Sequence, residues 1–175
     1  METQTVKPPS QINSASSKSM FKRILVAVDG SENSARASQA ALELTEKLRA
    51  DLIVLHAITP PALYYHTEIT PAGPVIEPPT HEKEIDLYLE YARRIAQGIV
   101  DGTVSAAKQR GIAVKAEIPE TSTSVVETIV NQAVKENADL IIVGTRGLGG
   151  FKKLLLGSVS SGVVDHAHCP VLVIR

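Results

Sequence analysis

Hydrophobic and polar positions form a regular series of blocks that predicts five strands and four helices. Unbroken apolar runs are typical of strands buried on both faces of a sheet, whereas helices repeat their apolar residues at helical spacing. Apolar runs occur at residues 24–28, 52–57, 140–143 and 171–174. Residues 112–118 alternate apolar and polar side chains, which predicts a half-covered strand nearer an edge of the sheet.

Helical spacing fills the intervals between these strands. Ser31 can cap the first helix, and Ser124 has capping-box spacing with Glu127. The four predicted helices cover residues 31–50, 81–111, 124–137 and 158–167. Because strands that alternate with helices form mostly parallel sheets, we predict an open five-stranded α/β fold with helices on both faces.

Two segments fall outside this alternation. Residues 1–20 are rich in Ser, Pro and Gln, which predicts a disordered tail before a single domain over residues 21–175. Residues 58–80 hold six of the ten prolines, and proline excludes a long helix or a central strand. We therefore expect a long, proline-rich surface loop there.

Charge and composition narrow the function classes. The formal net charge is -1, with 18 basic and 19 acidic residues, so no broad positive surface is expected for non-specific nucleic-acid binding. The sequence contains no signal-peptide core and no apolar run near the roughly 20 residues of a membrane span. The single cysteine, Cys169, cannot form an internal disulfide. We expect a cytoplasmic protein without nucleic-acid or membrane partners.

Glycines after the fourth predicted strand mark the strongest candidate site. Ligands of parallel sheets bind beyond the carboxyl ends of the strands, where Asp29 and Gly144 are expected. Glycine permits positive φ and close approach to the main chain, so Gly144 and Gly147 can form a tight loop with outward N–H groups. Gly157 and Ser158 open a helix whose free N–H groups favour a phosphate.

Other interpretations of the same residues stay open. The hydroxyls of Ser158 and Ser160 would add donors to a phosphate site, but glycine after a strand also makes simple turns. Gly149 and Gly150 can serve as a flexible joint. Neither the Walker A loop nor the dinucleotide fingerprint fits, because Gly150 and Lys152 stand where those motifs require Lys and Gly.

The spacing of these glycines resembles the signature of a known family. Gly144-x-x-Gly147, nine further residues and Gly157-Ser158 match the pattern G-2x-G-9x-G-(S/T) of universal stress proteins in their ATP-binding branch. Similar segments are 24–31, 53–57, 138–144 and 169–174, and the resemblance covers residues 21–175. It implies a Rossmann-like fold of the adenine nucleotide alpha hydrolase type with strand order 3-2-1-4-5.

The resemblance also implies a role for each matching position. Asp29 would lie near the ribose or a metal-bound phosphate, and the backbone at Ala57 would read the adenine edge. Arg146 lies outside this resemblance and can neutralise phosphate charge or be solvated. With it, the predicted nucleotide-binding residues are Ala27, Asp29, Ala57, Val143, Gly144, Arg146, Gly147, Gly157, Ser158, Val159 and Ser160. The implied ligand is ATP with Mg²⁺.

Several other residues have weaker functional interpretations. Lys152 and Lys153 can neutralise phosphate charge or be solvated, and packing explains His56 better than ligand binding. Tyr64 and Tyr65 can cover a bound base. The residues that suggest a metal are His66, His81, His166, His168 and Cys169, but they lack the spacing of a zinc site, and no base is placed to activate the cysteine.

The last predicted strand, Val171 to Ile174, is apolar and terminal, so an unpaired edge there would invite aggregation. Antiparallel pairing with a second copy would satisfy it, as in the common dimer of the family, unless the tail or the loop covers it. We expect a homodimeric, nucleotide-responsive stress or signalling module. A slow ATP hydrolase or phosphoryl-transfer enzyme using Asp29 and Mg²⁺, and an interaction protein that binds no nucleotide, are the alternatives.

Overall fold

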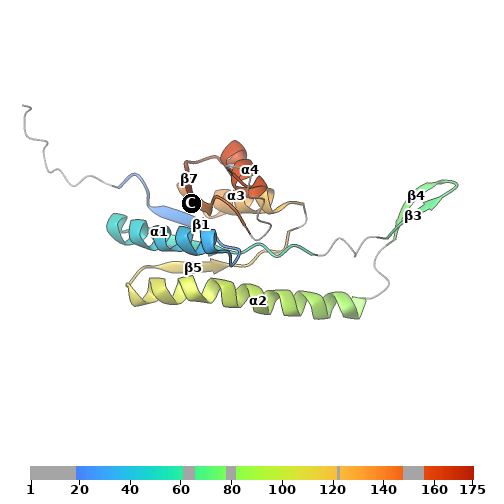
Figure 1. Cartoon of the computed structure of the whole chain (residues 1–175), viewed down its shortest axis with the longest axis horizontal. Coiled ribbons are helices and arrows are strands. Elements are labelled where there is room, and N and C mark those ends of the chain that lie inside the picture. Colours follow the sequence, from blue (N-terminus) through green and yellow to red (C-terminus); the bar gives the residue numbers. More distant parts are fainter. Residues whose placement is uncertain (1–18, 61–65, 78–81, 122, 148–155) are drawn as a thin grey trace, which may run out of the picture.

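The apolar runs become one central sheet in the computed structural model, which describes residues 19–60, 66–77, 82–121, 123–147 and 156–175. The sheet strands are β1 (Arg23–Ala27), β2 (Asp51–Leu55), β5 (Val114–Glu117), β6 (Leu140–Gly144) and β7 (Val171–Ile174). The helices are α1 (Glu32–Leu48), α2 (Glu82–Gln109), α3 (Val125–Lys135) and α4 (Ser158–His166). A separate hairpin consists of β3 (His66–Thr70) and β4 (Gly73–Glu77) (Figure 1).

All neighbouring strands of the central sheet are parallel, in the order β5-β2-β1-β6-β7. The predicted order 3-2-1-4-5 is confirmed, with β5 as the third sheet strand along the chain. In register, Leu25 of β1 lies between Ile53 of β2 and Ile141 of β6. The chain moves outward from β1 in one direction and then returns to β6 on its other side, which makes β1 and β6 the switch point of the topology.

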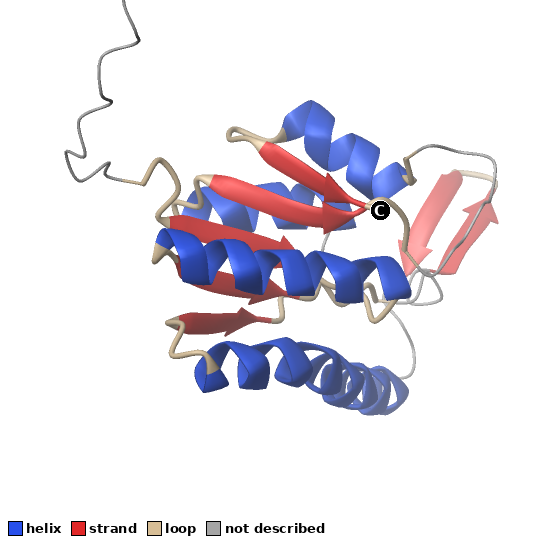
Figure 2. Cartoon of the chain, turned by 60° about the vertical axis from the view of Figure 1, so that its left-hand side comes forward, coloured by secondary structure: helices blue, strands red, loops and turns tan. Residues whose placement is uncertain are grey.

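Helices cover both faces of the sheet (Figure 2). Consecutive residues of a strand point to opposite faces, and in the central strands both sets of side chains are apolar. Ile24 and Val26 belong to a core that also contains residues of α1 and α2, such as Ala41 and Val100. The intervening Leu25 belongs to a second core with residues of α3 and α4. These central strands are therefore buried on both faces, as their unbroken apolar runs predict.

Two serines begin helices as predicted. The Ser31 hydroxyl accepts the N–H of Ser34 at 3.2 Å, and the Ser124 hydroxyl accepts the N–H of Glu127 at 3.1 Å. Both contacts satisfy a first-turn donor that lacks a partner within its own helix. These local hydrogen bonds explain why α1 and α3 begin at the positions that the sequence indicates.

The expected loop over residues 58–80 contains an element that the sequence analysis missed. Residues 66–77 form the antiparallel β3–β4 hairpin, which projects away from the central sheet (Figure 1). Its turn contains Pro71 and Ala72, and Gly73 follows with φ 118°. Proline favours the second position of a turn, and glycine tolerates the positive φ that follows. The six prolines excluded this segment from the central sheet but not from a separate ribbon.

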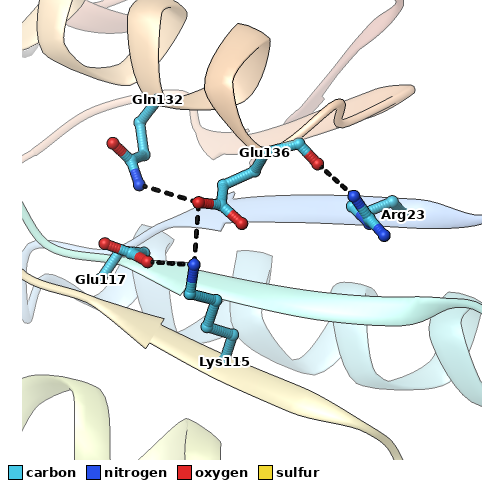
Figure 3. Close-up of polar contacts among 5 residues, drawn as sticks. All are labelled: Arg23, Lys115, Glu117, Gln132 and Glu136. Atoms are coloured by element: carbon cyan, nitrogen blue, oxygen red, sulfur yellow. Dashed lines mark hydrogen bonds and ion pairs between the residues drawn. The ribbon is translucent and has the colours of Figure 1, made fainter.

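A polar cluster fastens the edge strand β5 to the end of α3 (Figure 3). The Lys115 ammonium lies 2.7 Å from a carboxylate oxygen of Glu117 and 2.9 Å from one of Glu136. Arg23 of β1 donates to the backbone carbonyl of Glu136 at 2.7 Å. The hydrogen bond from Lys115 holds the pKa of the Glu136 carboxyl below its ordinary value of 4.5.

This cluster predicts a pH-dependent contribution to stability. A carboxyl with a lowered folded-state pKa stabilises the fold above its unfolded pKa and loses that contribution as pH falls through the folded value. We expect Glu136→Gln to lower the free energy of unfolding at neutral pH, with the difference from the parent narrowing below pH 4.5. Urea denaturation at a series of pH values measures this difference.

Lys115→Met provides the matched background, because it removes the main cause of the lowered pKa. There the additional Glu136→Gln change should have little dependence on pH. A difference between parent and Glu136→Gln that stays constant through the acidic range would contradict this account.

The predicted disordered tail lies almost entirely outside the described residues, which begin at Ser19. Within the described part of the chain, no helix is both long enough and apolar enough to span a membrane.

Candidate functional site

The candidate site lies where the carboxyl ends of β1 and β6 bring two loops together. A cavity of about 590 Å³ opens there, a volume within the usual range of small-molecule sites. Every residue predicted to bind a nucleotide lines it: Ala27, Asp29, Ala57, Val143, Gly144, Arg146, Gly147, Gly157, Ser158, Val159 and Ser160. The fold brings these positions together, whereas their roles toward a ligand remain predictions.

Part of the cavity wall is apolar and was missed by the sequence analysis. Leu55 at the end of β2 and Ile129 of α3 are almost completely buried, and Val125 begins α3 beside them. The sequence spacing of these residues fits the core as well as it fits a cavity wall. The helix start at Ser124 could have indicated their position, since helices begin at the edge of the sheet where parallel strands end and ligands bind. Other lining residues outside the predicted set are Val28, Ser34, His56, Thr59 and Leu156.

The polar part of the wall is the start of α4. Its N-cap, Gly157, supplies no side-chain cap, in contrast to the serines that cap α1 and α3. Ser161 donates to the Gly157 carbonyl at 2.9 Å, so the earlier N–H groups of Ser158, Val159 and Ser160 have no acceptor within the helix. These donors and the positive end of the helix dipole form a place suited to an anion.

The Ser160 hydroxyl, which the sequence offers as a donor to a phosphate, has partners within the protein. It donates to the carbonyl of Thr145 at 2.9 Å and lies 3.0 Å from the carbonyl of Gly157. The Gly157 N–H also donates to Thr145, at 2.7 Å. The hydroxyl proton therefore fastens α4 to the loop after β6, and the backbone N–H is the group that Ser160 can offer to a ligand.

Close approach, and not positive φ, explains the first two signature glycines. Neither Gly144 nor Gly147 has a left-handed φ, so that part of the prediction was wrong. A Cβ on Gly144 would lie 2.9 Å from the backbone carbonyl carbon of Asn33, and one on Gly147 would collide with the carboxylate of Asp29. Both glycines let the loop after β6 pack directly against the segment that follows β1.

Hydrogen bonds reinforce this contact between the two loops. One carboxylate oxygen of Asp29 accepts the N–H of Ser31 at 3.0 Å. The Ser31 hydroxyl and the Asn33 side-chain amide donate to the Arg146 carbonyl at 3.4 and 3.3 Å. Asp29 is the one acidic residue among the described residues that line the cavity. The loop after β1 thus places the Asp29 carboxylate at the cavity, while Ser31 and Asn33 bind the loop after β6.

His56 joins the ends of the two strands β1 and β2. Its Nδ1 lies 2.8 Å from the carbonyl oxygen of Val28. A carbonyl only accepts, so Nδ1 carries the proton in this contact. The Val28 N–H in turn donates to the carbonyl of Leu55 at 2.8 Å. This structural role agrees with the prediction that packing explains His56.

His166, His168 and Cys169 belong to no metal-ligand group within the described segments. His166 and His168 each place one ring nitrogen within 3.1 Å of a backbone carbonyl. Burial raises the pKa of the Cys169 thiol, and the Asp139 carboxylate adds to the effect, so the reactive thiolate is disfavoured. No group of three or more His, Cys, Asp or Glu residues in the described segments is arranged to hold a metal ion.

Some predicted residues cannot be placed in this arrangement. His66 lies in β3. The following lie outside the described residues: Tyr64, Tyr65, His81, Gly149, Gly150, Lys152 and Lys153. Their interpretations therefore remain as the sequence left them.

A model of the universal stress protein family matches residues 20–175. The chain belongs to this family. The universal stress protein YxiE of Bacillus subtilis is 35% identical over 156 residues, which cover 89% of this chain and 100% of that protein.

Solved universal stress proteins share the Rossmann-like fold. UspA from Lactobacillus plantarum matches with a TM-score of 0.70 and 28% identity, and the match covers 89% of this chain and 98% of the UspA chain. A protein from Archaeoglobus fulgidus in complex with dAMP has a TM-score of 0.59 and 20% identity, covering 89% and 99%. Another universal stress protein, in complex with cAMP, has a TM-score of 0.58 and 23% identity, covering 89% and 97%. At these lower identities the likeness concerns the fold alone.

The packing of Gly144 in this universal stress protein predicts a stability defect in Gly144→Ala. The added methyl group would meet the backbone of Asn33, which cannot rotate away as a side chain can. We expect the free energy of unfolding to fall by about 1–3 kcal/mol, as measured by urea denaturation. An unchanged stability would show that the loop after β6 does not need the close contact with α1.

Proposed function

We propose that this universal stress protein binds an adenine nucleotide, ATP, and acts as a homodimeric stress or signalling module whose state depends on the nucleotide. The observation that carries the proposal is the start of α4, which directs uncapped N–H groups into a cavity bordered by the complete glycine signature. The first N–H groups of a helix have no acceptor within the helix itself, so they are available to a ligand at its start. An anion would accept hydrogen bonds from these groups.

The phosphate groups would occupy the polar end of the cavity. The backbone N–H groups of Ser158, Val159 and Ser160 supply charge-assisted hydrogen bonds worth about 1.5–3 kcal/mol each. Three of them could provide a large part of the ~8 kcal/mol that corresponds to micromolar affinity. Gly147 and Arg146 also line the cavity.

The base and ribose would occupy the other end of the cavity. Ala27 and Val143 border it at the ends of β1 and β6, and the buried side chains of Leu55 and Ile129 make its wall apolar. The backbone of Ala57, just beyond β2, would read the edge of the adenine. An apolar wall with a few polar backbone groups is the usual composition of a site for a flat, neutral ring.

A Mg²⁺ ion would enter with the nucleotide. This ion is commonly held by one or two carboxylates together with phosphate oxygens, and Asp29 supplies one carboxylate in the cavity. The ion would neutralise phosphate charge beside that carboxylate. The described residues hold no larger group of acidic side chains that would bind it without the nucleotide.

The complexes of other universal stress proteins with dAMP and cAMP support the ligand class. Both ligands combine an adenine ring with a phosphate, which are the two groups that the apolar and polar ends of this cavity suit. ATP is preferred here because the uncapped helix start offers several donors, enough for more than one phosphate group.

Ser158→Pro tests the role of the α4 backbone. Proline is well tolerated at the first position of a helix, and the extended conformation of Gly157 (φ -75°, ψ 165°) suits the residue before it. The change removes one N–H donor, so ATP affinity should fall about tenfold or more. Isothermal titration calorimetry with Mg²⁺ and ATP measures the loss.

Ser158→Ala is the matched control, because it removes the hydroxyl and keeps the backbone N–H. Its affinity for ATP should stay closer to that of the parent. Equal ATP affinities of Ser158→Pro and the parent, with both proteins folded by circular dichroism, would count against phosphate binding at this helix start. Absence of heat with ATP, ADP and AMP in the parent would remove the proposal itself.

The proposed homodimer uses the edge of β7. This strand pairs only with β6 among the described strands, so its other edge carries unsatisfied backbone groups. Pro170 and Ile174 accept hydrogen bonds from β6 and the residue after it. In the regular pattern of a parallel pair the alternate residues Val171 and Val173 then direct their N–H and C=O groups outward.

Val173→Pro should therefore break the dimer without breaking the pairing of β7 with β6. Proline is accepted on edge strands whose N–H faces away from the sheet, and here it removes a donor that a second copy would need. Light scattering should give a lower mass for Val173→Pro than for the control Val173→Thr, which keeps the N–H. Equal masses would argue that β7 is not the dimer contact.

A further inference from the structure

The outer face of α2 carries large apolar side chains that the described part of the chain leaves exposed. Leu87, Tyr91 and Ile95 follow one another at intervals of four residues and are 68%, 62% and 49% exposed. Ala96 and Val100 on the opposite side of the helix are fully buried, and Val100 belongs to the core shared with β1 and α1. In Figures 1 and 2 α2 is an outer element, with no other helix or strand beyond it. Apolar residues in a row on a solvent face are typical of a protein contact.

Two glycines continue this row toward the end of the helix. Gly98 and Gly102 are exposed, and a Cβ built on either would meet no atom within 4 Å. Glycine inside a helix costs about 0.5–1 kcal/mol relative to alanine. Within the described structure neither position needs a glycine for its own packing, so both leave open space on the outer face of α2.

The large and small residues together form a seam with the heptad spacing of paired helices. Intervals of three and four alternate along the exposed row Tyr88, Tyr91, Ile95, Gly98, Gly102 and Ser105. This alternation repeats every seven residues and keeps one stripe facing a neighbouring helix. The stripe spans about 27 Å along the helix axis.

We propose that this seam pairs with the same seam of a second copy of the chain, with the two α2 helices antiparallel. A two-fold axis midway between Ile95 and Gly98 places Ile95 opposite Gly98 of the partner subunit. The same axis places Tyr91 opposite Gly102 of the partner subunit. Each large side chain then fills the space above a glycine on the other helix, and the symmetry repeats every such contact.

Charge complementarity supports the antiparallel arrangement. Arg94 and Asp101 flank the seam on one side, and the two-fold axis brings Arg94 next to Asp101 of the partner subunit. Within one chain these residues are seven positions apart, about 10.5 Å along the helix, which is beyond direct contact. Their present contacts are local: Arg94 lies 3.5 Å from Glu90, and Gln97 donates to Asp101 at 2.7 Å.

A parallel pair of α2 helices would lack both features. Equivalent residues would then face each other, so tyrosines would meet tyrosines and glycines would meet glycines, leaving crowding at one end and a gap at the other. The seam is also separate from the proposed dimer contact, because α2 packs against β5 and β2 while β7 forms the opposite edge of the sheet. The inference therefore holds whether or not β7 pairs and whether or not a nucleotide binds.

A charge exchange between copies tests the proposal. All variants are made in the Val173→Pro background, so that pairing of β7 strands does not contribute to association. If Val173→Pro disturbs folding, the same variants are compared in the parent sequence. Arg94→Asp places two aspartates together across the seam, and Asp101→Arg places two arginines together. Each variant alone should self-associate about tenfold more weakly than its parent. Analytical ultracentrifugation over a range of concentrations measures the association.

An equimolar mixture of the two variants should recover association, because every contact between unlike chains again joins opposite charges. The double variant Arg94→Asp, Asp101→Arg should recover it within one chain type. A structural effect inside one subunit cannot produce recovery on mixing. A mixture no tighter than its components, or a parent that stays monomeric in the Val173→Pro background at every concentration, would overturn the proposal. So would unchanged association in Ile95→Asp.

Discussion

The parallel pairing of β1 with β6 is the contact on which the candidate site depends. These strands are distant in sequence and adjacent in the sheet, and the chain leaves them toward opposite faces. Their carboxyl ends therefore border a space that no connecting helix fills. The cavity, the carboxylate of Asp29 and the start of α4 all lie at this one point.

The glycines of the signature serve the fold before they serve a ligand. Gly144 admits the backbone of Asn33, and Gly147 admits the side chain of Asp29. The hydroxyl of Ser160 is likewise engaged with the carbonyl of Thr145. The first backbone N–H groups of α4 also line the cavity, and the helix fixes their positions so that they cannot rotate away. Donors held in this way are preorganised for an anion.

The two proposed contacts between copies lie on opposite sides of the protomer and have different chemistry. The β7 edge offers backbone hydrogen bonds, and the α2 seam offers side chains that alternate between large and small. Each contact is isologous, since the same surface occurs on both subunits. A protomer that uses both contacts can bind two neighbouring copies at once, one through β7 and one through α2.

The sequence by itself determined the four helices, the five strands of the central sheet and their order along the chain, because burial on both faces and capping serines are local signals. Strand order and the nucleotide roles came from family resemblance, and residues 66–77 were missed because the prolines suggested only a loop. Tertiary structure alone decided that Leu55 and Ile129 border the cavity, that Ser160 binds a carbonyl, and that the signature glycines admit neighbouring segments. Those facts depend on atoms brought together from distant positions, and no spacing along the chain encodes a distance across it.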